Sequence, residues 1–181
     1  MHRFIAVSLF LCFLFSASVV SAGAPPLKSS LNLDPLSGQL PDSHLEMVSG
    51  DTVQLRRSRA QLTVISFWAL WCKPCLKELP QLDRLHRTYS DSGLRILPVN
   101  VSDTPGAIRA LWERKNLSLP SYVDSNRRLH KMYDTSSFYA LPFGIVVKQG
   151  EYVGIYRGAR DFGKPELFNR LKAILSNNRV N

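Results

Sequence analysis

Two cysteines separated by two residues are the part of this sequence best suited to chemistry. A nearly continuous apolar run, residues 62–68, leads into Trp71-Cys72-Lys73-Pro74-Cys75. The run predicts a buried strand, and the residues after it predict a helix whose first turn carries both thiols. Thiols at this spacing can form and exchange a disulfide. The sequence therefore predicts a dithiol/disulfide exchange site.

The two cysteines have different expected roles. Cys72 is predicted at the helix N-terminus, where unpaired backbone N–H groups and the positive charge of Lys73 raise its thiolate fraction. Cys75, one turn later and more enclosed, is placed to attack the mixed disulfide that Cys72 forms with a substrate. Pro74 restricts the turn between them. We expect Cys72 to attack and Cys75 to resolve.

Metal and haem patterns do not fit these cysteines. A structural zinc site needs four ligands, and the sequence has neither a second CxxC nor two histidines at zinc-finger spacing. Leu76 follows Cys75, where a c-type haem attachment motif has histidine. The sequence therefore predicts no metal and no cofactor.

The N-terminus is typical of an exported protein. A basic start at 1–3 precedes an apolar run at 4–20, and small residues before Gly23 allow cleavage. We interpret 1–22 as a signal peptide. Spanning a bilayer needs about 20 residues, a length that the apolar run barely reaches. If the segment is not cleaved, we expect it to tether the protein to a membrane.

The remaining sequence predicts one domain behind a linker. Residues 23–41 are rich in proline, serine and glycine and lack a sustained period, which indicates a linker or a loosely packed lead-in. Residues 42–178 are long enough for a single domain with a sizeable core. Apolar patterns predict a hairpin, three strand–helix units, a second hairpin and a terminal helix, which is typical of a mixed sheet flanked by helices. The expected strands are 45–48, 52–55, 62–68, 94–101, 120–123, 143–147 and 151–156.

The formal net charge is +9, but the basic residues are scattered. Small clusters occur at 56–59 and 127–128, and no aromatic residues alternate with them in a stripe suited to stacking on bases. A solvated basic surface explains this pattern better than a nucleic-acid site, so we expect no nucleic-acid partner.

Residues 64–80 resemble the active-site segment of the exported TlpA-like thioredoxins, a group that includes the thiol reductases of cytochrome c maturation. Residues 140–144, the turn at 149–150 and Gly158 are similar to the cis-proline strand and hairpin of the same fold. The resemblance covers roughly 45–177. It implies a thioredoxin fold with an N-terminal β-hairpin and a central strand–helix insertion, within a mixed α/β sheet flanked by helices.

The resemblance also assigns residue roles. It implies that Pro142 follows a cis peptide bond facing the cysteines, and that the backbone of Leu141 pairs with the substrate chain. Glu78 matches an acid that could move protons between the sulfurs and solvent, although an acid at a helix start is also stabilised by the helix dipole. At the strand position where cytosolic thioredoxin has a buried acid, this sequence has Ser66. The acid expected to take part in proton transfer is therefore Glu78.

Tryptophans near the motif have two interpretations, packing or substrate contact. We expect Trp68 in the core and Trp71 exposed beside Cys72, where it contacts substrate together with Lys73 and Pro74. Trp112 and Met132 stand at helical spacing and are expected in the core.

The expected function is that of a periplasmic thiol:disulfide oxidoreductase, monomeric, which reduces protein disulfides and recovers electrons from a membrane donor protein. Lys73-Pro74 does not fix the reduction potential, so a thiol oxidant or isomerase of the same compartment remains an alternative. A thioredoxin-fold binding or chaperone module with little turnover is another. A peroxidase of this fold is disfavoured, because the cysteines occur as CxxC and not as a lone thiol.

Overall fold

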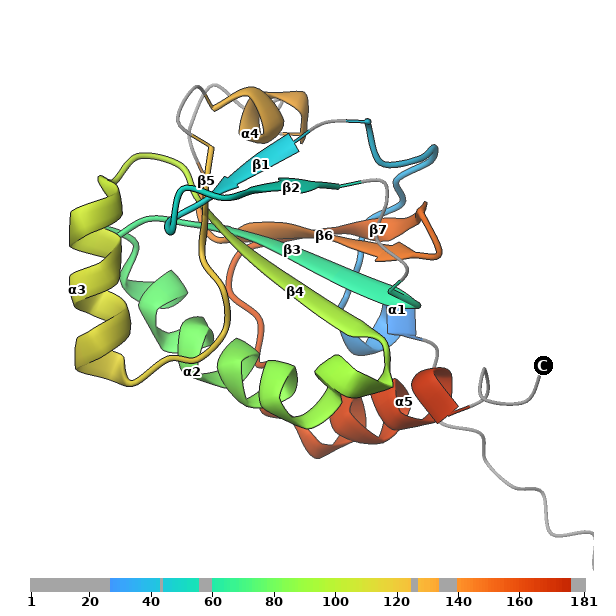
Figure 1. The fold of residues 1–181 in the computed structure, drawn as a ribbon. Coiled ribbons are helices and arrows are strands. Elements are labelled where there is room, and N and C mark those ends of the chain that lie inside the picture. Colours follow the sequence, from blue (N-terminus) through green and yellow to red (C-terminus); the bar gives the residue numbers. More distant parts are fainter. Residues whose placement is uncertain (1–26, 43, 56–59, 125–126, 134–139, 177–181) are drawn as a thin grey trace, which may run out of the picture.

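The computed structural model describes residues 27–42, 44–55, 60–124, 127–133 and 140–176 (Figure 1). The predicted signal peptide, 1–22, lies outside these residues. Within the described ranges, no helix is both long enough and apolar enough to cross a membrane.

Strands and helices follow one another largely as the sequence predicts. In chain order the elements are α1 (Leu27–Ser30), β1 (His44–Met47), β2 (Thr52–Gln54), β3 (Leu62–Trp68), α2 (Lys73–Tyr89), η1 (Ser90–Ser92), β4 (Leu94–Asn100), α3 (Pro105–Lys115), β5 (Tyr122–Val123), α4 (Arg128–Tyr133), β6 (Phe143–Lys148), β7 (Glu151–Arg157) and α5 (Pro165–Ser176). The two hairpins are β1–β2 and β6–β7, and β5 with α4 forms the predicted insertion. The predicted α/β fold is therefore confirmed.

The described strands form one mixed sheet in the order β2-β1-β5-β4-β3-β6-β7. In its interior, β3 pairs in parallel with β4 and antiparallel with β6, and every residue of β3 is buried. A strand buried on both faces carries apolar residues without alternation, which explains the continuous run in the sequence. This arrangement places the CxxC motif at the carboxyl end of β3, a strand in the interior of the sheet.

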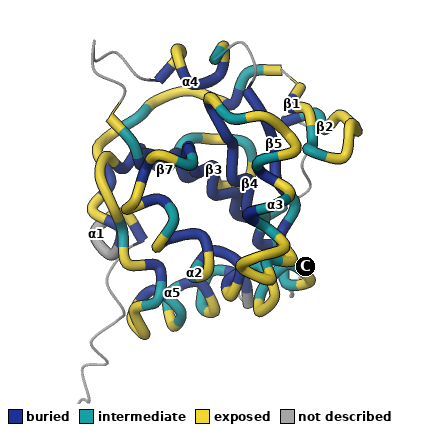
Figure 2. Tube along the Cα trace, turned by 90° about the vertical axis from the view of Figure 1, so that its left-hand side faces the viewer, coloured by how far each residue is buried: buried dark blue, intermediate teal, exposed yellow. Residues whose placement is uncertain are grey.

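Helices cover both faces of the sheet (Figures 1 and 2). On one side, Leu62 and Val64 of β3 pack with leucines of α2 and α5. On the other, Ile65 and Phe67 pack with residues of α4 and of the β1–β2 hairpin. Alternate side chains of one strand thus serve two cores, and the strand is held firmly in place.

The structure differs from the linker expectation over residues 27–41. Leu27, Leu31 and Leu33 are buried in the core beside α5, and Leu40 is buried on the opposite face. Backbone bonds also join Asp34 to β7, from Asp34 N to the Ile155 carbonyl at 2.8 Å and back at 3.0 Å. The segment is held by tertiary contacts, which a composition rich in proline, serine and glycine does not reveal.

The sequence predicts three large side chains in the core, those of Trp68, Trp112 and Met132. Trp68 is buried, as predicted. Trp112 is half-buried, and its indole N–H donates to the Leu119 carbonyl at 2.7 Å. The core prediction for Met132 is wrong, because its side chain is 53% exposed. The short helix α4 turns Leu129 and Tyr133 inward and leaves Met132 on its outer face.

Candidate functional site

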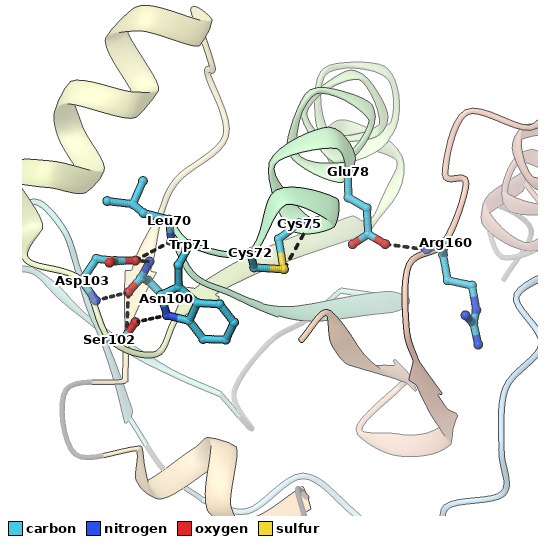
Figure 3. The surroundings of a disulfide bond; sticks show 9 residues. All are labelled: Leu70, Trp71, Cys72, Cys75, Glu78, Asn100, Ser102, Asp103 and Arg160. Carbon is cyan, nitrogen blue, oxygen red and sulfur yellow. Dashed lines mark hydrogen bonds between the residues drawn. A yellow bond between two sulfur atoms is a disulfide. The ribbon is translucent and has the colours of Figure 1, made fainter. Parts of the chain in front are cut away.

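The structure joins Cys72 and Cys75 in a disulfide at the start of α2 (Figure 3). Cys72 is the N-cap residue of this helix, and the backbone N–H of Cys75 donates to its sulfur at 3.2 Å. A sulfur at this position accepts an N–H that the helix itself leaves unpaired, which favours a thiolate. The geometry therefore agrees with the expectation that Cys72 carries the reactive sulfur.

Residues around the disulfide form an exposed rim. Both cysteines are buried in the oxidised protein, whereas Lys73 and Pro74 are exposed and the side chain of Trp71 is 59% exposed. These three exposed residues are therefore the ones beside the disulfide that solvent reaches most readily. Trp71, Lys73 and Pro74 together form the rim.

The rim is braced by a loop that follows β4. The Asp103 carboxylate accepts a bond from the backbone N–H of Leu70 at 2.7 Å and one from the Asn100 side-chain amide at 2.8 Å. In turn, the side-chain amide oxygen of Asn100, Oδ1, accepts the N–H groups of Ser102 and Asp103 at 3.0 and 2.7 Å. The loops after two neighbouring parallel strands therefore hold each other in place. Thr104, the residue after Asp103, is the N-cap of α3.

Trp71 is fixed by the same loop. Its indole N–H donates to the Ser102 hydroxyl at 3.2 Å (Figure 3), while Trp71 as a whole stays largely exposed. An exposed aromatic ring held in one orientation offers apolar contact area at low entropic cost. The prediction that Trp71 is exposed beside Cys72 is confirmed.

The Leu141-Pro142 segment lies near the disulfide, although it is far from both cysteines in the sequence. Their peptide bond is cis, as the resemblance implies. Pro142 is buried and its carbonyl accepts the N–H of Gly158 at 2.8 Å, while half-buried Leu141 packs against the cluster that contains both cysteines. The structure therefore brings the predicted substrate-binding segment next to the predicted reactive thiols.

Glu78 lies one turn beyond Cys75 on α2 and is almost fully buried, with 3% of its surface exposed. One carboxylate oxygen, Oε1, accepts the backbone N–H of Arg160 at 2.5 Å (Figure 3). The other, Oε2, has no hydrogen-bond partner among the described residues. Burial raises the pKa of Glu78 to about 7, although the Arg160 N–H and the positive charge of Arg160 act in the opposite direction. A carboxyl with this pKa can both accept and release a proton near neutral pH.

A buried phenol completes the polar surroundings of Glu78. Tyr156 on β7 stands opposite Gly144 on β6, and a Cβ at position 144 would collide with the phenol and with the Ile65 carbonyl. Only glycine leaves room for this ring. Burial first, and then the negative charge of Glu78, raises the pKa of Tyr156. The phenol therefore stays protonated next to the carboxyl.

Sequence reasoning missed Tyr156 and Arg160. The one available signal was Ser66, a polar residue inside an apolar strand, which indicated a buried polar neighbour. Elsewhere, the described residues contain no group of three His, Cys, Asp or Glu side chains that could hold a metal ion. The chemistry that this arrangement can perform is thus disulfide exchange with a nearby proton acceptor.

Comparison with known proteins gives matches over most of the domain. The model of the AhpC/TSA family matches residues 36–153. The thiol-disulfide oxidoreductase ResA of Geobacillus kaustophilus is 30% identical over 135 residues, which cover 74% of this chain and 75% of that protein. ResA of Halalkalibacterium halodurans is 27% identical over 115 residues, 63% of this chain. That match spans 64% of the relative, a little less than two thirds of its length.

A solved structure supports the fold. The thiol:disulfide interchange protein from Chlorobium tepidum TLS, a thioredoxin family protein, aligns with a TM-score of 0.65 at 17% identity and covers 78% of this chain and 99% of that one. At this identity the likeness establishes the thioredoxin fold. The family match covers more than half of the chain and the resemblance to thiol-exchanging thioredoxins is confirmed. The chain belongs to the AhpC/TSA family.

Proposed function

We propose that this protein is an exported thiol:disulfide oxidoreductase that reduces protein disulfides through Cys72 and Cys75. The observation that carries the proposal is the pair itself, a disulfide at a helix N-terminus with a buried carboxyl, Glu78, one turn away. Relatives named thiol-disulfide oxidoreductase support it. So does the predicted signal peptide, 1–22, which agrees with a periplasmic location for the domain at 42–178.

In the proposed reaction, the reduced protein transfers two electrons to its substrate. The Cys72 thiolate attacks one sulfur of the substrate disulfide, forming a mixed disulfide and releasing a substrate thiolate that takes up a proton. Cys75 then loses its proton and attacks Cys72, which closes the Cys72-Cys75 bond and releases the second substrate sulfur as a thiol. Glu78 is the group placed to accept the proton of Cys75.

Substrate recognition in this proposal uses the rim and the segment at Leu141 and Pro142. A substrate strand pairs with the backbone of Leu141, and its side chains contact the ring of Trp71. The protein acts as a monomer without a cofactor and needs an external reductant to reopen its disulfide. A membrane protein that delivers electrons is the proposed donor.

Replacement of Trp71 by alanine should affect protein substrates more than small ones. Removal of the exposed ring takes away a fixed apolar contact, so kcat/KM for a folded protein disulfide should fall about tenfold. Exchange with oxidised glutathione, which needs only the sulfur, should change little. Met132→Ala is the matched control, because it also removes a large exposed side chain but on α4. Equal losses for both substrates would contradict a recognition role for Trp71.

The direction of the reaction is tested by the equilibrium reduction potential of the Cys72-Cys75 pair against glutathione. We expect a value near that of thioredoxin, about −270 mV, and a value near −120 mV would identify an oxidant instead. The variant with both cysteines changed to serine is the control. If that variant retained the effect of the protein on its substrates, exchange would not be the function.

A further inference from the structure

Arg160 is bound to an unusual number of backbone carbonyls. From the loop after β7, its guanidinium donates through Nε to the Leu31 carbonyl at 2.7 Å and through Nη2 to the Asn32 carbonyl at 3.2 Å. Its Nη1 donates to the carbonyls of residues 157, 158 and 159 at 3.0, 3.2 and 3.1 Å. The planar fork of arginine can serve several acceptors at once, which the single nitrogen of lysine cannot. The side chain thus ties its own loop to the N-terminal segment.

The backbone of the same residue contacts the proposed proton acceptor. The N–H of Arg160 is the hydrogen-bond donor to Glu78 Oε1, and the Arg160 guanidinium lies over the Tyr156 ring, with its central carbon 5.6 Å from the ring centroid. Because this donor belongs to a loop and not to a helix or strand, its position depends on what fixes the loop. The bonds of the guanidinium fix the loop at Arg160, while the Gly158 and Phe162 N–H groups hold its two ends through the Pro142 carbonyl and the Gln81 side chain.

We propose that Arg160 is a positioning residue for Glu78, whose guanidinium anchors the loop so that its own N–H stays bonded to the carboxylate. Arg160 thereby sets the pH at which Glu78 exchanges its proton with the active-site sulfurs. The inference rests on the proposed function of Glu78 in thiol exchange. The Arg160 side chain thereby links the carbonyls of residues 31 and 32 to Glu78.

Other groups that face Glu78 do not account for this effect. Tyr156 from β7 stays protonated, Ser66 from β3 carries no charge, and Cys75 on α2 is held in the disulfide in the oxidised protein. Arg160 supplies both the donor and the positive charge that favour the ionised carboxylate. Loss of its anchoring should therefore raise the pKa of Glu78 above its present value of about 7.

The test is a titration of the Glu78 side-chain carboxyl by carbon NMR in the oxidised full chain, without substrate. Arg160→Gln removes the fork and the charge, and we expect the midpoint to rise by about one pH unit. Arg160→Lys keeps the charge but not the fork, and we expect a rise here as well. Arg157→Gln is the matched control, since Arg157 in the same hairpin pairs with exposed Asp34 at 2.8 Å and should leave the midpoint unchanged.

Each outcome supports or overturns the proposal. If the Glu78 midpoint in Arg160→Lys equals that of the unsubstituted protein, the positive charge alone lowers the pKa of Glu78. That result would refute positioning by the guanidinium bonds. If Arg160→Gln does not fold, the lysine variant still decides. An unchanged midpoint in folded Arg160→Gln would also refute it. Since the titration involves no exchange reaction, these results are distinct from failure of the proposed function, which the cysteine variants test.

Discussion

Cys75→Ser should accumulate a covalent complex with a protein substrate, whereas Cys72→Ser should form none. Cys72 is the N-cap residue of α2 and its sulfur accepts the Cys75 N–H, a position that favours a thiolate. Once Cys72 has attacked, the mixed disulfide can resolve only if Cys75 supplies the second thiolate. Without Cys75 the complex should persist, and turnover should fall to the uncatalysed background in both variants.

The measurement is a non-reducing gel of each reduced variant incubated with an oxidised protein substrate. Trapped complex should disappear on addition of a thiol reductant, which distinguishes it from aggregation. The double variant, with both cysteines changed to serine, controls for the third cysteine of the chain, Cys12. Comparable trapping by Cys72→Ser and Cys75→Ser would mean that either sulfur can attack, and the assignment of roles would be wrong.

The cysteines and their scaffold could be predicted from sequence because their signals are local. An unbroken apolar run marks β3, and the CxxC motif follows it directly. Turn residues at Gly50 and Gly150 mark the two hairpins, and both adopt positive φ. Segment 27–41 lacked such a signal, because its leucines alternate irregularly with polar residues, proline and glycine. They are buried against α5 and the sheet, contacts that the local pattern does not show.

The polar parts of the site could not be predicted in the same way. Glu78 receives its hydrogen bond from the backbone of Arg160, and a backbone donor has no sequence signature. Asn100 and Asp103 brace Leu70 only because β3 and β4 are parallel neighbours whose ends meet at one edge. These contacts join residues far apart in the chain, so they follow from topology and not from any local pattern.

Glu78→Gln should remove a pH dependence from the stability of the oxidised protein. The pKa of Glu78 is raised from 4.5 to about 7 in the folded state, mainly by burial. Below pH 4.5 the carboxyl is neutral in both states, so burial adds no ionisation penalty there. Between pH 4.5 and 7 the unfolded chain releases the proton while the folded protein retains it, so the free energy of unfolding falls as pH rises.

This difference in pKa corresponds to about 3 kcal/mol once the pH exceeds 7, since each pKa unit contributes about 1.4 kcal/mol. Glutamine is neutral at every pH and its carbonyl can still accept the Arg160 N–H. Relative to the unsubstituted protein, Glu78→Gln should therefore gain up to about 3 kcal/mol in free energy of unfolding between pH 4.5 and pH 8. Urea unfolding at these two pH values, with the disulfide intact, measures the change.

Glu113→Gln on α3 is the matched control, because it makes the same substitution on an exposed face of a helix and should follow the unsubstituted protein at both pH values. If Glu78→Gln also ran parallel to the unsubstituted protein, the carboxyl would not be a buried acid in the folded state. A gain confined to Glu78→Gln would show that the fold holds a protonated carboxyl beside Cys75 near neutral pH, at a cost in stability, in a place where thiol exchange can use its proton.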